Sequence, residues 1–295
     1  MQKDKAYSIV LLVVLSIIWG SSFILMKTGL TAYSWQQVAA MRISIAGLIF
    51  IPYVLFKIKA IKKLKYILLF AFLEVGFPPF CFTFAQQYVD SSTAGILNSL
   101  VPLFTLLTGL FLFSVKTDFL KILGVSIGLF GALLIVAFKQ GSATFMDFSN
   151  AYGLLIVLAT LMYGIAGNVL KEKLSDVSSM LITATSFTCL GIPAAIFLFS
   201  TGVTDIPLSN AHNLKAFLSI TTLSIFGSAL AIVIFNVLIK KSTALFASFV
   251  TYLVPFMALF WGALDGENIS YIHFLSLILI LLGISIANKK IKNHS

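Results

Sequence analysis

The sequence predicts an all-α integral membrane protein with ten membrane-spanning helices, arranged as two inverted five-helix repeats. Three observations predict this fold class: the composition, ten long apolar runs, and similar residues that recur between 144 and 153 positions apart. Hydrophobic residues make up 59% of the 295-residue chain, and charged residues make up only 10%. Soluble domains average about 25% charged residues, so this chain has too few to cover the surface of a soluble globule.

Ten apolar segments of about 20 residues can each cross a hydrocarbon core of about 30 Å. Their ranges are 7–28, 35–56, 66–88, 92–114, 119–138, 150–170, 178–200, 215–238, 243–262 and 270–288. The first run is longer than the apolar region of a signal peptide, so we expect it to be retained as a helix. We divide the chain into two five-helix halves, 1–139 and 140–295, because the connections are too short to hold a soluble domain.

The lysines predict the orientation of these helices in the membrane. If the N-terminus lies inside, the inner segments hold 16 of the 20 basic residues and the outer segments hold only Lys139 and Lys215. This bias places both termini in the cytoplasm. It also explains the net charge of +10 without nucleic-acid binding. Lys27 lies near the outer end of the first helix, where we expect its side chain to extend to the membrane surface.

Four offsets between similar residues indicate an internal repeat. The matched pairs are Trp19 with Tyr163 and Lys27 with Lys171, Gly76 with Gly227 and Phe84 with Phe235, Pro102 with Pro255, and Gly131 with Gly283. A repeat of five helices enters the membrane in the opposite sense the second time, because five is odd. Inverted repeats with a binding site near the midplane are typical of secondary transporters.

Prolines mark places where the helices are expected to break. Pro102 and Pro255 each lie inside an apolar run and occupy matching positions of the two halves. A proline removes a backbone hydrogen bond, and in lipid the freed carbonyl needs a partner from a neighbouring helix or a wet cavity. Pro78 adds another break, opposite Gly227 in the second half. The predicted helix breaks are therefore Pro78, Pro102, Gly227 and Pro255.

Several of these stretches resemble one known family. The residues that carry the resemblance are Trp19-Gly20-Ser21-Ser22-Phe23, Arg42, and the stretches 91–102 and 255–267. They are similar to the EamA-type, ten-helix members of the drug/metabolite transporter superfamily. The resemblance implies a plasma-membrane permease, usually an exporter of amino acids or other small metabolites, with a central cavity between the halves. One departure concerns the acidic residue that follows the second proline helix, Glu267: the equivalent position of the first half is occupied by Ser114, which is not acidic.

Polar and aromatic residues at mid-depth are the candidate substrate-binding residues. Trp19 and Tyr163 occupy matching positions, where their rings either line a cavity or pack between helices. Ser22 either supplies a hydroxyl to the cavity or permits close helix packing. Asn98, Thr251 and Tyr252 precede the two prolines, where they either bond freed carbonyls or face the cavity.

Glu74 and Arg42 are the candidate coupling residues or ion pair. Glu74 is the one carboxylate predicted well inside a helix, and acids in the membrane mark proton or ion paths by default. Arg42 lies in the second predicted span and Glu74 in the third. We expect Arg42 either to form a structural ion pair with Glu74 or to bind a substrate carboxylate. The alternative for Glu74 is a position near the inner mouth.

These patterns favour a secondary transporter that exports small metabolites by alternating access, with amino acids or related zwitterions as the favoured cargo and proton coupling as an option. Two alternatives are a passive channel and a membrane enzyme acting on a lipid-linked substrate. The expected partners are a small-molecule substrate, the lipid bilayer and, for a coupled carrier, protons. We expect no catalytic residue, metal or cofactor, and neither Cys81 nor Cys189 has a neighbour that indicates a disulfide or metal site. The patterns specify no oligomeric state.

Overall fold

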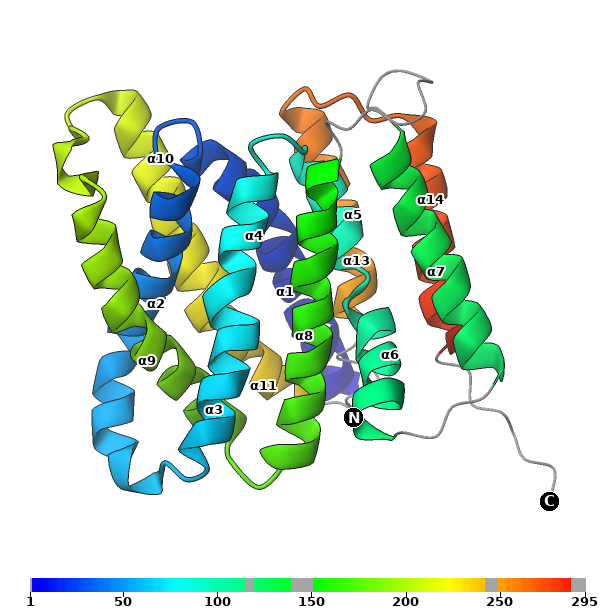
Figure 1. Cartoon of the computed structure of the whole chain (residues 1–295), viewed down its shortest axis with the longest axis horizontal. Helices are drawn as coiled ribbons and strands as arrows, with labels where there is room; N and C mark the ends of the chain where they lie inside the picture. The colour runs from blue at the N-terminus through cyan, green and yellow to red at the C-terminus, as the bar shows by residue number, and fades with distance from the viewer. Residues whose placement is uncertain (1, 115–118, 139–150, 242–248, 288–295) are drawn as a thin grey trace.

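The protein is a bundle of helices in the computed structural model, which describes residues 2–114, 119–138, 151–241 and 249–287 (Figure 1). No strand occurs in these described ranges, so the predicted all-α class is confirmed. The elements of the first half are α1 (Gln2–Gly29), α2 (Trp35–Lys57), η1 (Ile58–Ala60), α3 (Leu64–Ala71), η2 (Phe72–Gly76), α4 (Phe77–Ala85), α5 (Ser91–Asn98), α6 (Val101–Phe113) and α7 (Phe119–Ala137).

The second half begins with α8 (Gly153–Lys173), α9 (Ser179–Ser200), η4 (Val203–Asp205), α10 (Ala211–Thr222), η5 (Leu223–Leu230), α11 (Ala231–Lys241), α13 (Val250–Leu264) and α14 (Tyr271–Ala287). Among the described residues, 8 helical stretches are long and apolar enough to cross a membrane. They coincide with the first eight predicted spans. The ninth and tenth coincide with α13 and α14, which are shorter apolar helices, and the ninth begins within 242–248, outside the described residues.

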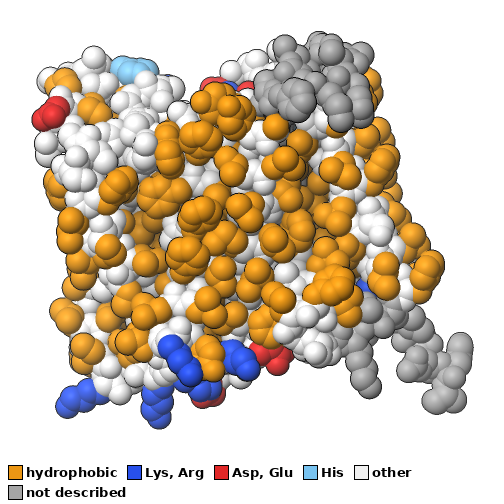
Figure 2. Space-filling model, in the orientation of Figure 1, with side chains coloured by type: hydrophobic (Ala, Val, Ile, Leu, Met, Phe, Trp, Pro, Cys, Tyr) orange, Lys and Arg blue, Asp and Glu red, His pale blue; other side chains and the backbone are white. Residues whose placement is uncertain are grey.

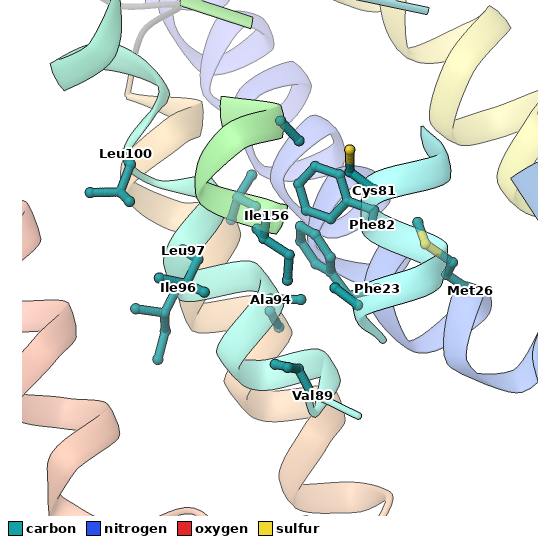
Figure 3. Close-up of a cluster of buried hydrophobic side chains, with 14 of the residues drawn as sticks. Phe23, Met26, Cys81, Phe82, Val89, Ala94, Ile96, Leu97, Leu100 and Ile156 are labelled. Atoms are coloured by element: carbon teal, nitrogen blue, oxygen red, sulfur yellow. The ribbon is translucent and has the colours of Figure 1, made fainter. Parts of the chain in front are cut away.

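The surface of the bundle is that of a membrane protein. Large apolar side chains cover the face shown in Figure 2, and charged side chains gather at its ends. Phe56, Phe111 and Phe119 leave 82%, 76% and 74% of their surfaces uncovered, which in water would expose a large apolar area. Inside, α1, α4, α5 and α8 meet in an apolar core that includes Phe23 and Ile156 (Figure 3). Cys81 is buried in this core as a free thiol, and Cys189 is also free.

Two of the predicted spans contain a π-helical segment near their middle. The first segment, η2, joins α3 to α4 and ends at Gly76, and the second, η5, joins α10 to α11 and contains Gly227. Pro78 follows η2 in the first turn of α4, and its missing N–H cannot bond to a carbonyl of the preceding helical turn. The backbone irregularities predicted at Pro78 and Gly227 are therefore present as π-helical segments.

The two proline-containing spans differ from each other. The chain leaves helical form between α5 and α6, at residues 99–100, and Pro102 lies in the first turn of α6, close to where the break was predicted. In contrast, α13 runs unbroken through the buried Pro255, and the predicted break at that proline is wrong. This part of α13 packs closely on α1: at Gly20 the two helices approach so closely that a Cβ would lie 2.9 Å from the Val254 carbonyl oxygen.

Glycines allow the closest helix crossings. At Gly47 and Gly191, α2 and α9 touch, because a Cβ on either residue would lie 2.9 Å from the Cα of the other. A second crossing joins α7 to α14 at the right of Figure 1, where a Cβ on Gly124 would lie 2.5 Å from the Gly283 carbonyl oxygen. Such small-residue contacts bring backbones together in lipid, where the hydrophobic effect does not drive helix association.

We expect Gly47→Leu to separate α2 from α9 and to lower the stability of the purified protein by about 1–3 kcal/mol, the usual cost of overpacking. Thermal unfolding in detergent, followed by size-exclusion chromatography of the full chain, measures the effect. Gly167→Ala on α8 is the matched control, because the nearest atom to its added Cβ is 3.8 Å away. Equal unfolding temperatures for wild type and Gly47→Leu would contradict the assignment of this crossing.

Candidate functional site

The π-helical segment η5 is held by side chains from two other helices. Trp19 of α1 donates a hydrogen bond from its indole Nε1 to the Gly227 carbonyl oxygen at 3.1 Å. Arg42 of α2 donates from Nε to Ser228 Oγ at 3.4 Å. A π-helical turn leaves carbonyl groups that do not follow the regular α-helical ladder, and in lipid these groups need partners of this kind. The contacts place Trp19 and Arg42 beside the same segment of the chain.

Arg42 also lies within electrostatic range of Glu74, which is part of the other π-helical segment, and of Tyr163 on α8. Arg42 and Glu74 form no ion pair within 4.0 Å, and the ion pairs found among the described residues involve other side chains. Both side chains are half-buried although each lies near the middle of its span. The Arg42 guanidinium and the Glu74 carboxyl group therefore lie within electrostatic range of each other at mid-span without direct contact.

Aromatic rings flank these charges. Trp19 packs on Phe235 of α11 with ring centroids 5.5 Å apart, and Tyr163 stacks on Phe82 of α4 at 6.1 Å with an interplanar angle of 21°. Trp19 and Tyr163 are both half-buried, so each ring keeps part of its surface uncovered. The aromatic residues predicted at matching positions thus each pack on a phenylalanine of another helix; Tyr163 lies within electrostatic range of Arg42 and Glu74, and Trp19 contacts the η5 segment that Arg42 also contacts.

The remaining predicted site residues fall into two groups. Ser22 lies beside η5, because a Cβ on Gly227 would be 3.1 Å from Ser22 Oγ, but the hydroxyl donates to the Ile18 carbonyl of its own helix at 3.2 Å. Asn98, Thr251 and Tyr252 are half-buried on α5 and α13, which pack on each other and on α1. Helix α1 is therefore the element that the two groups share.

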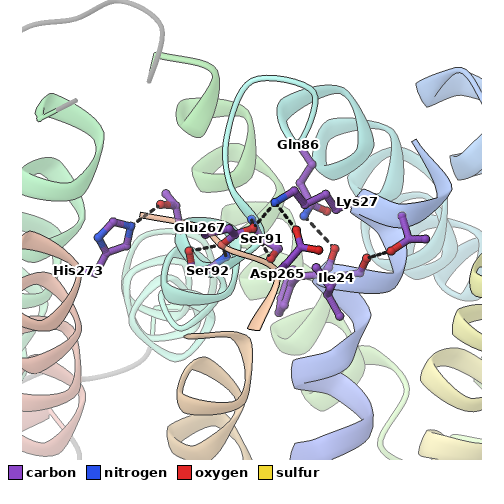
Figure 4. Close-up of polar contacts among 11 residues, drawn as sticks. Ile24, Lys27, Gln86, Ser91, Ser92, Asp265, Glu267 and His273 are labelled. Carbon is purple, nitrogen blue, oxygen red and sulfur yellow. Dashed lines mark hydrogen bonds and ion pairs between the residues drawn. The ribbon is translucent and has the colours of Figure 1, made fainter. Parts of the chain in front are cut away.

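A second polar cluster was not predicted as a unit: Glu267 with Lys27, Ser91, Ser92 and Asp265, named here the Glu267 clasp (Figure 4). The Glu267 carboxylate accepts hydrogen bonds from the backbone N–H groups of Ser91 at 2.9 Å and Ser92 at 3.0 Å, and from both serine hydroxyls. It thereby caps the N-terminus of α5, where the helix dipole favours a negative charge. The Lys27 ammonium lies 2.7 Å from Glu267 and 2.7 Å from Asp265.

The charge of Glu267 is strongly stabilised by this cluster. Burial alone would raise the pKa of its carboxyl group, but hydrogen bonds from Lys27, Ser92 and Ser91 outweigh burial and lower that pKa to about 2. The Glu267 side chain is only 2% exposed. Lys27 was expected to extend to the membrane surface; the structure adds that its ammonium pairs with two carboxylates beside the end of α5. Asp90, next to the cluster, has a pKa raised by burial and by the Glu267 charge.

No group of three or more metal-binding side chains occurs in the part of the chain that the structure describes. Two grooves of about 360 Å³ and 270 Å³ lie between α1 and α10 and along the α2–α9 crossing. Their linings are mainly apolar, and neither includes Arg42 or Glu74. The grooves therefore do not define the functional site, which we assign to the charged and aromatic residues around η2 and η5.

An apolar helical bundle with opposite charges, aromatic rings and irregular helices at its middle is the architecture of a multi-pass membrane transporter. The EamA-like transporter family matches residues 6–137 and again residues 151–289, and the chain belongs to this family. It is thus a multi-pass protein of the inner membrane, as the sequence predicted.

Known proteins similar to this chain are transporters by name. The inner membrane transporter YedA of Escherichia coli K12 is 26% identical over 275 residues, covering 92% of this chain and 87% of YedA. The transporter YoaV of Bacillus subtilis is 26% identical, covering 91% and 92%. A protein of Chlamydia muridarum named S-adenosylmethionine/S-adenosylhomocysteine transporter is 24% identical, covering 85% and 82%. One solved crystal structure shares the fold with a TM-score of 0.62 at 15% identity, over 96% of each chain.

We expect Glu267→Gln to lower the unfolding temperature by about 5 °C, because an amide places N–H donors against the serine N–H groups and leaves Lys27 without its buried partner. The carboxyl pKa is lowered from 4.5 to about 2. Its contribution to stability is therefore complete above about pH 5 and is lost as the pH falls towards 2. Scanning the unfolding temperature from pH 5 to about 8 should give a constant difference between wild type and variant.

Asp265→Asn is the matched control for this measurement. Asp265 also lies 2.7 Å from Lys27, but its side chain is 43% exposed and makes no bond to the serines. Its loss should lower the unfolding temperature much less. Equal effects of the two substitutions would mean that the ion pair alone, rather than the cap on α5, stabilises this end of the bundle.

Proposed function

We propose that this protein is a secondary transporter that exports small zwitterionic metabolites, amino acids or related compounds, across the plasma membrane by alternating access. One observation carries the proposal: the Arg42 guanidinium and the Glu74 carboxyl group lie within electrostatic range of each other at mid-span without an ion pair. A zwitterion presents a carboxylate and an ammonium group on one small molecule. It can therefore satisfy both charges at once, and a charge of one sign could not.

The roles of the residues follow from their chemistry. Arg42 clamps the substrate carboxylate, since a guanidinium offers several donors in one plane. Glu74 receives the substrate ammonium group, and Trp19 and Tyr163 pack against the rest of the molecule. Ser22, Asn98, Thr251 and Tyr252 belong to the wider lining of the same path. The Chlamydia relative named for S-adenosylmethionine supports this substrate class, because that molecule is an amino acid carrying a further cation and an aromatic base.

The transport cycle rests on an inverted repeat of the halves 1–139 and 140–295, with ten membrane spans and both termini in the cytoplasm. Three pairs of backbone features support the repeat beyond the two family matches. The π-helical segments begin at Phe72 and Leu223, 151 residues apart, and the short η1 and η4 turns begin 145 residues apart. A residue in the left-handed conformation follows each proline-containing helix: Ser114 caps α6, and Gly266 follows the Asp265 cap of α13. The two are 152 residues apart.

This register shifts the counterpart of Glu267 by one residue. With Ser114 opposite Gly266, the residue opposite Glu267 is Val115, which lies outside the described residues but is not acidic. Lys171, the counterpart of Lys27, faces Glu172 of its own helix at 3.9 Å on an exposed surface. We therefore assign the Glu267 clasp to the outer end of the molecule alone, where it closes the outer side of the central site.

A second contact supports closure at that end. Tyr88, just before α5, stacks on Tyr152, just before α8, with ring centroids 3.9 Å apart. Both the stack and the clasp join residues of the first half to residues of the second. An exporter needs this arrangement at rest, because its empty site must first open to the cytoplasm. Substrate binding then opens the outer end, and protonation of Glu74 is the step at which a proton gradient would enter the cycle.

The two alternatives make different predictions. A passive channel would show flux that does not saturate and no counter-exchange, whereas a carrier shows both saturation and exchange. A membrane enzyme would need acids, histidines or metal ligands gathered at one membrane face. The charged and aromatic residues around η2 and η5 do not resemble such a cluster, so transport is the function the geometry supports best.

Transport into proteoliposomes tests the proposal. We expect saturable, exchangeable uptake of one or more labelled zwitterions from a panel that includes amino acids and S-adenosylmethionine. Arg42→Gln should lower uptake by at least about tenfold, because a charge-assisted contact to a carboxylate is worth about 1.5–3 kcal/mol. Arg42→Lys should restore part of it. Uptake that is insensitive to both substitutions would remove Arg42 from the site.

Glu74→Gln separates substrate binding from proton coupling. For a coupled carrier, the variant should lose the dependence of uptake on a pH gradient while exchange of substrate across the membrane continues. For a carrier in which Glu74 only binds the ammonium group, both activities should fall together. Unchanged uptake with unchanged pH dependence would show that Glu74 takes no part in transport.

Distance measurements test the outer closure. Spin labels at Gln87→Cys and Leu264→Cys, both exposed, report the separation of the two halves when Cys81→Ala and Cys189→Ser remove the native thiols. We expect one short distance in the unsubstituted clasp and an added longer distance in Glu267→Gln. Asp176→Asn, which removes the exposed partner of Lys63, is the control and should leave the distribution unchanged. A single short distance in all three proteins would refute the clasp as a gate.

A further inference from the structure

The connection between α2 and α3 concentrates positive charge on one exposed segment. Within nine residues it carries Lys57, Lys59, Lys62, Lys63 and Lys65, all exposed. Lys63 pairs with Asp176 at 2.6 Å. The other four lysines have no carboxylate within 4.0 Å in the described part of the chain. Their charges are therefore available to an external anion.

The segment has a fixed shape. Its middle is the 3₁₀ turn η1, closed by a bond from the Ile61 N–H to the Ile58 carbonyl at 3.2 Å. Lys63 adopts a left-handed conformation with φ of 57°, which a lysine seldom does. It is held there by bonds from its ammonium to Asp176 and, at 3.1 Å, to the Lys173 carbonyl. The lysines around it are thus presented on an ordered turn, which lowers the entropy lost when an anion binds.

Apolar side chains lie directly beside these lysines. Leu55, Phe56 and Ile58 leave 64%, 82% and 56% of their surfaces uncovered. The Lys57 ammonium lies 5.3 Å from the centre of the Phe56 ring, and the Lys65 ammonium lies 4.9 Å from that of Tyr66. In Figure 2 the basic side chains gather at one end of the molecule, below the apolar band. A ligand that fits this surface has an anionic group at the lysines and hydrocarbon beside the apolar side chains.

The second half provides an internal comparison. The connection between α9 and α10 contains the matching 3₁₀ turn η4, 145 residues after η1, and its sequence from 201 to 210 holds Asp205 but no lysine or arginine. The backbone of this connection therefore forms without basic residues. Something other than the fold accounts for the five lysines of the first half.

We propose that the α2–α3 connection is a binding site for anionic phospholipids, in which Lys57, Lys59, Lys62 and Lys65 contact the phosphodiester headgroup while Leu55, Phe56 and Ile58 contact its acyl chains. Juxtamembrane lysine clusters attract anionic lipid by about 1 kcal/mol per lysine. The site does not depend on the proposed substrate, and only its assignment to the cytoplasmic leaflet rests on the proposed orientation. Lysines that serve only to orient the chain during insertion would give the folded protein no lipid preference.

Spin-labelled lipids test the site on the full chain. The protein is reconstituted in phosphatidylcholine bilayers with traces of spin-labelled phosphatidylglycerol or phosphatidylcholine, and electron paramagnetic resonance measures the fraction of each label immobilised by the protein. Wild type should prefer phosphatidylglycerol, and Lys59→Gln with Lys62→Gln should reduce that preference by about fivefold or more. In about 1 M salt, where the screening length falls to ~3 Å, the wild-type preference should also fall.

Matched variants distinguish a lipid site at this connection from a general attraction of the basic protein for anions. Lys171→Gln with Lys173→Gln removes two lysines from the end of α8 and should leave the preference unchanged, while replacing all four site lysines by arginine should retain it. Millimolar inorganic phosphate should not displace the lipid. The proposal is overturned if the Lys59/Lys62 variant keeps the wild-type preference, if both double variants lose it equally, or if free phosphate abolishes it.

Discussion

The whole structure depends on one constraint: inside a bilayer, every backbone polar group must find a hydrogen-bond partner within the protein. This constraint explains why the described chain is helical throughout its apolar spans. It also explains the many serine and threonine hydroxyls bonded to the carbonyl four residues earlier in their own helix, such as Ser16 to Leu12 and Ser44 to Ala40. Where a helix departs from regular form, another element must supply the missing partner.

That requirement connects the irregular helices to function. The π-helical segment η5 receives hydrogen bonds from Trp19 and Arg42, and η2 carries Glu74. The departures from regular helix therefore bring an indole, a guanidinium and a carboxylate towards the middle of the bundle. Ionisable groups at this depth are costly, which is why we propose that this region handles the cargo.

The Glu267 clasp applies the same rule at the end of a helix. The first N–H groups of α5 have no partner within their own helix, and the Glu267 carboxylate supplies one from the other half of the chain. Because the two halves are linked through this cap, the bundle cannot separate there without exposing unpaired N–H groups and a buried charge. In the proposed transport cycle, opening this end would require new partners for both, which water could provide.

The sequence by itself determined the membrane class, the approximate positions of the apolar spans and the neighbourhoods of the helix irregularities near Pro78, Pro102 and Gly227. These features depend on local composition and on backbone chemistry within a few residues. Only the tertiary structure decided that Pro255 lies within a continuous helix, where α13 packs closely on α1. It also decided the partners of Lys27 and Glu267, which lie 240 residues apart in the chain. Such pairs arise from the packing of distant helices, and no local pattern in the sequence records which polar groups that packing brings together.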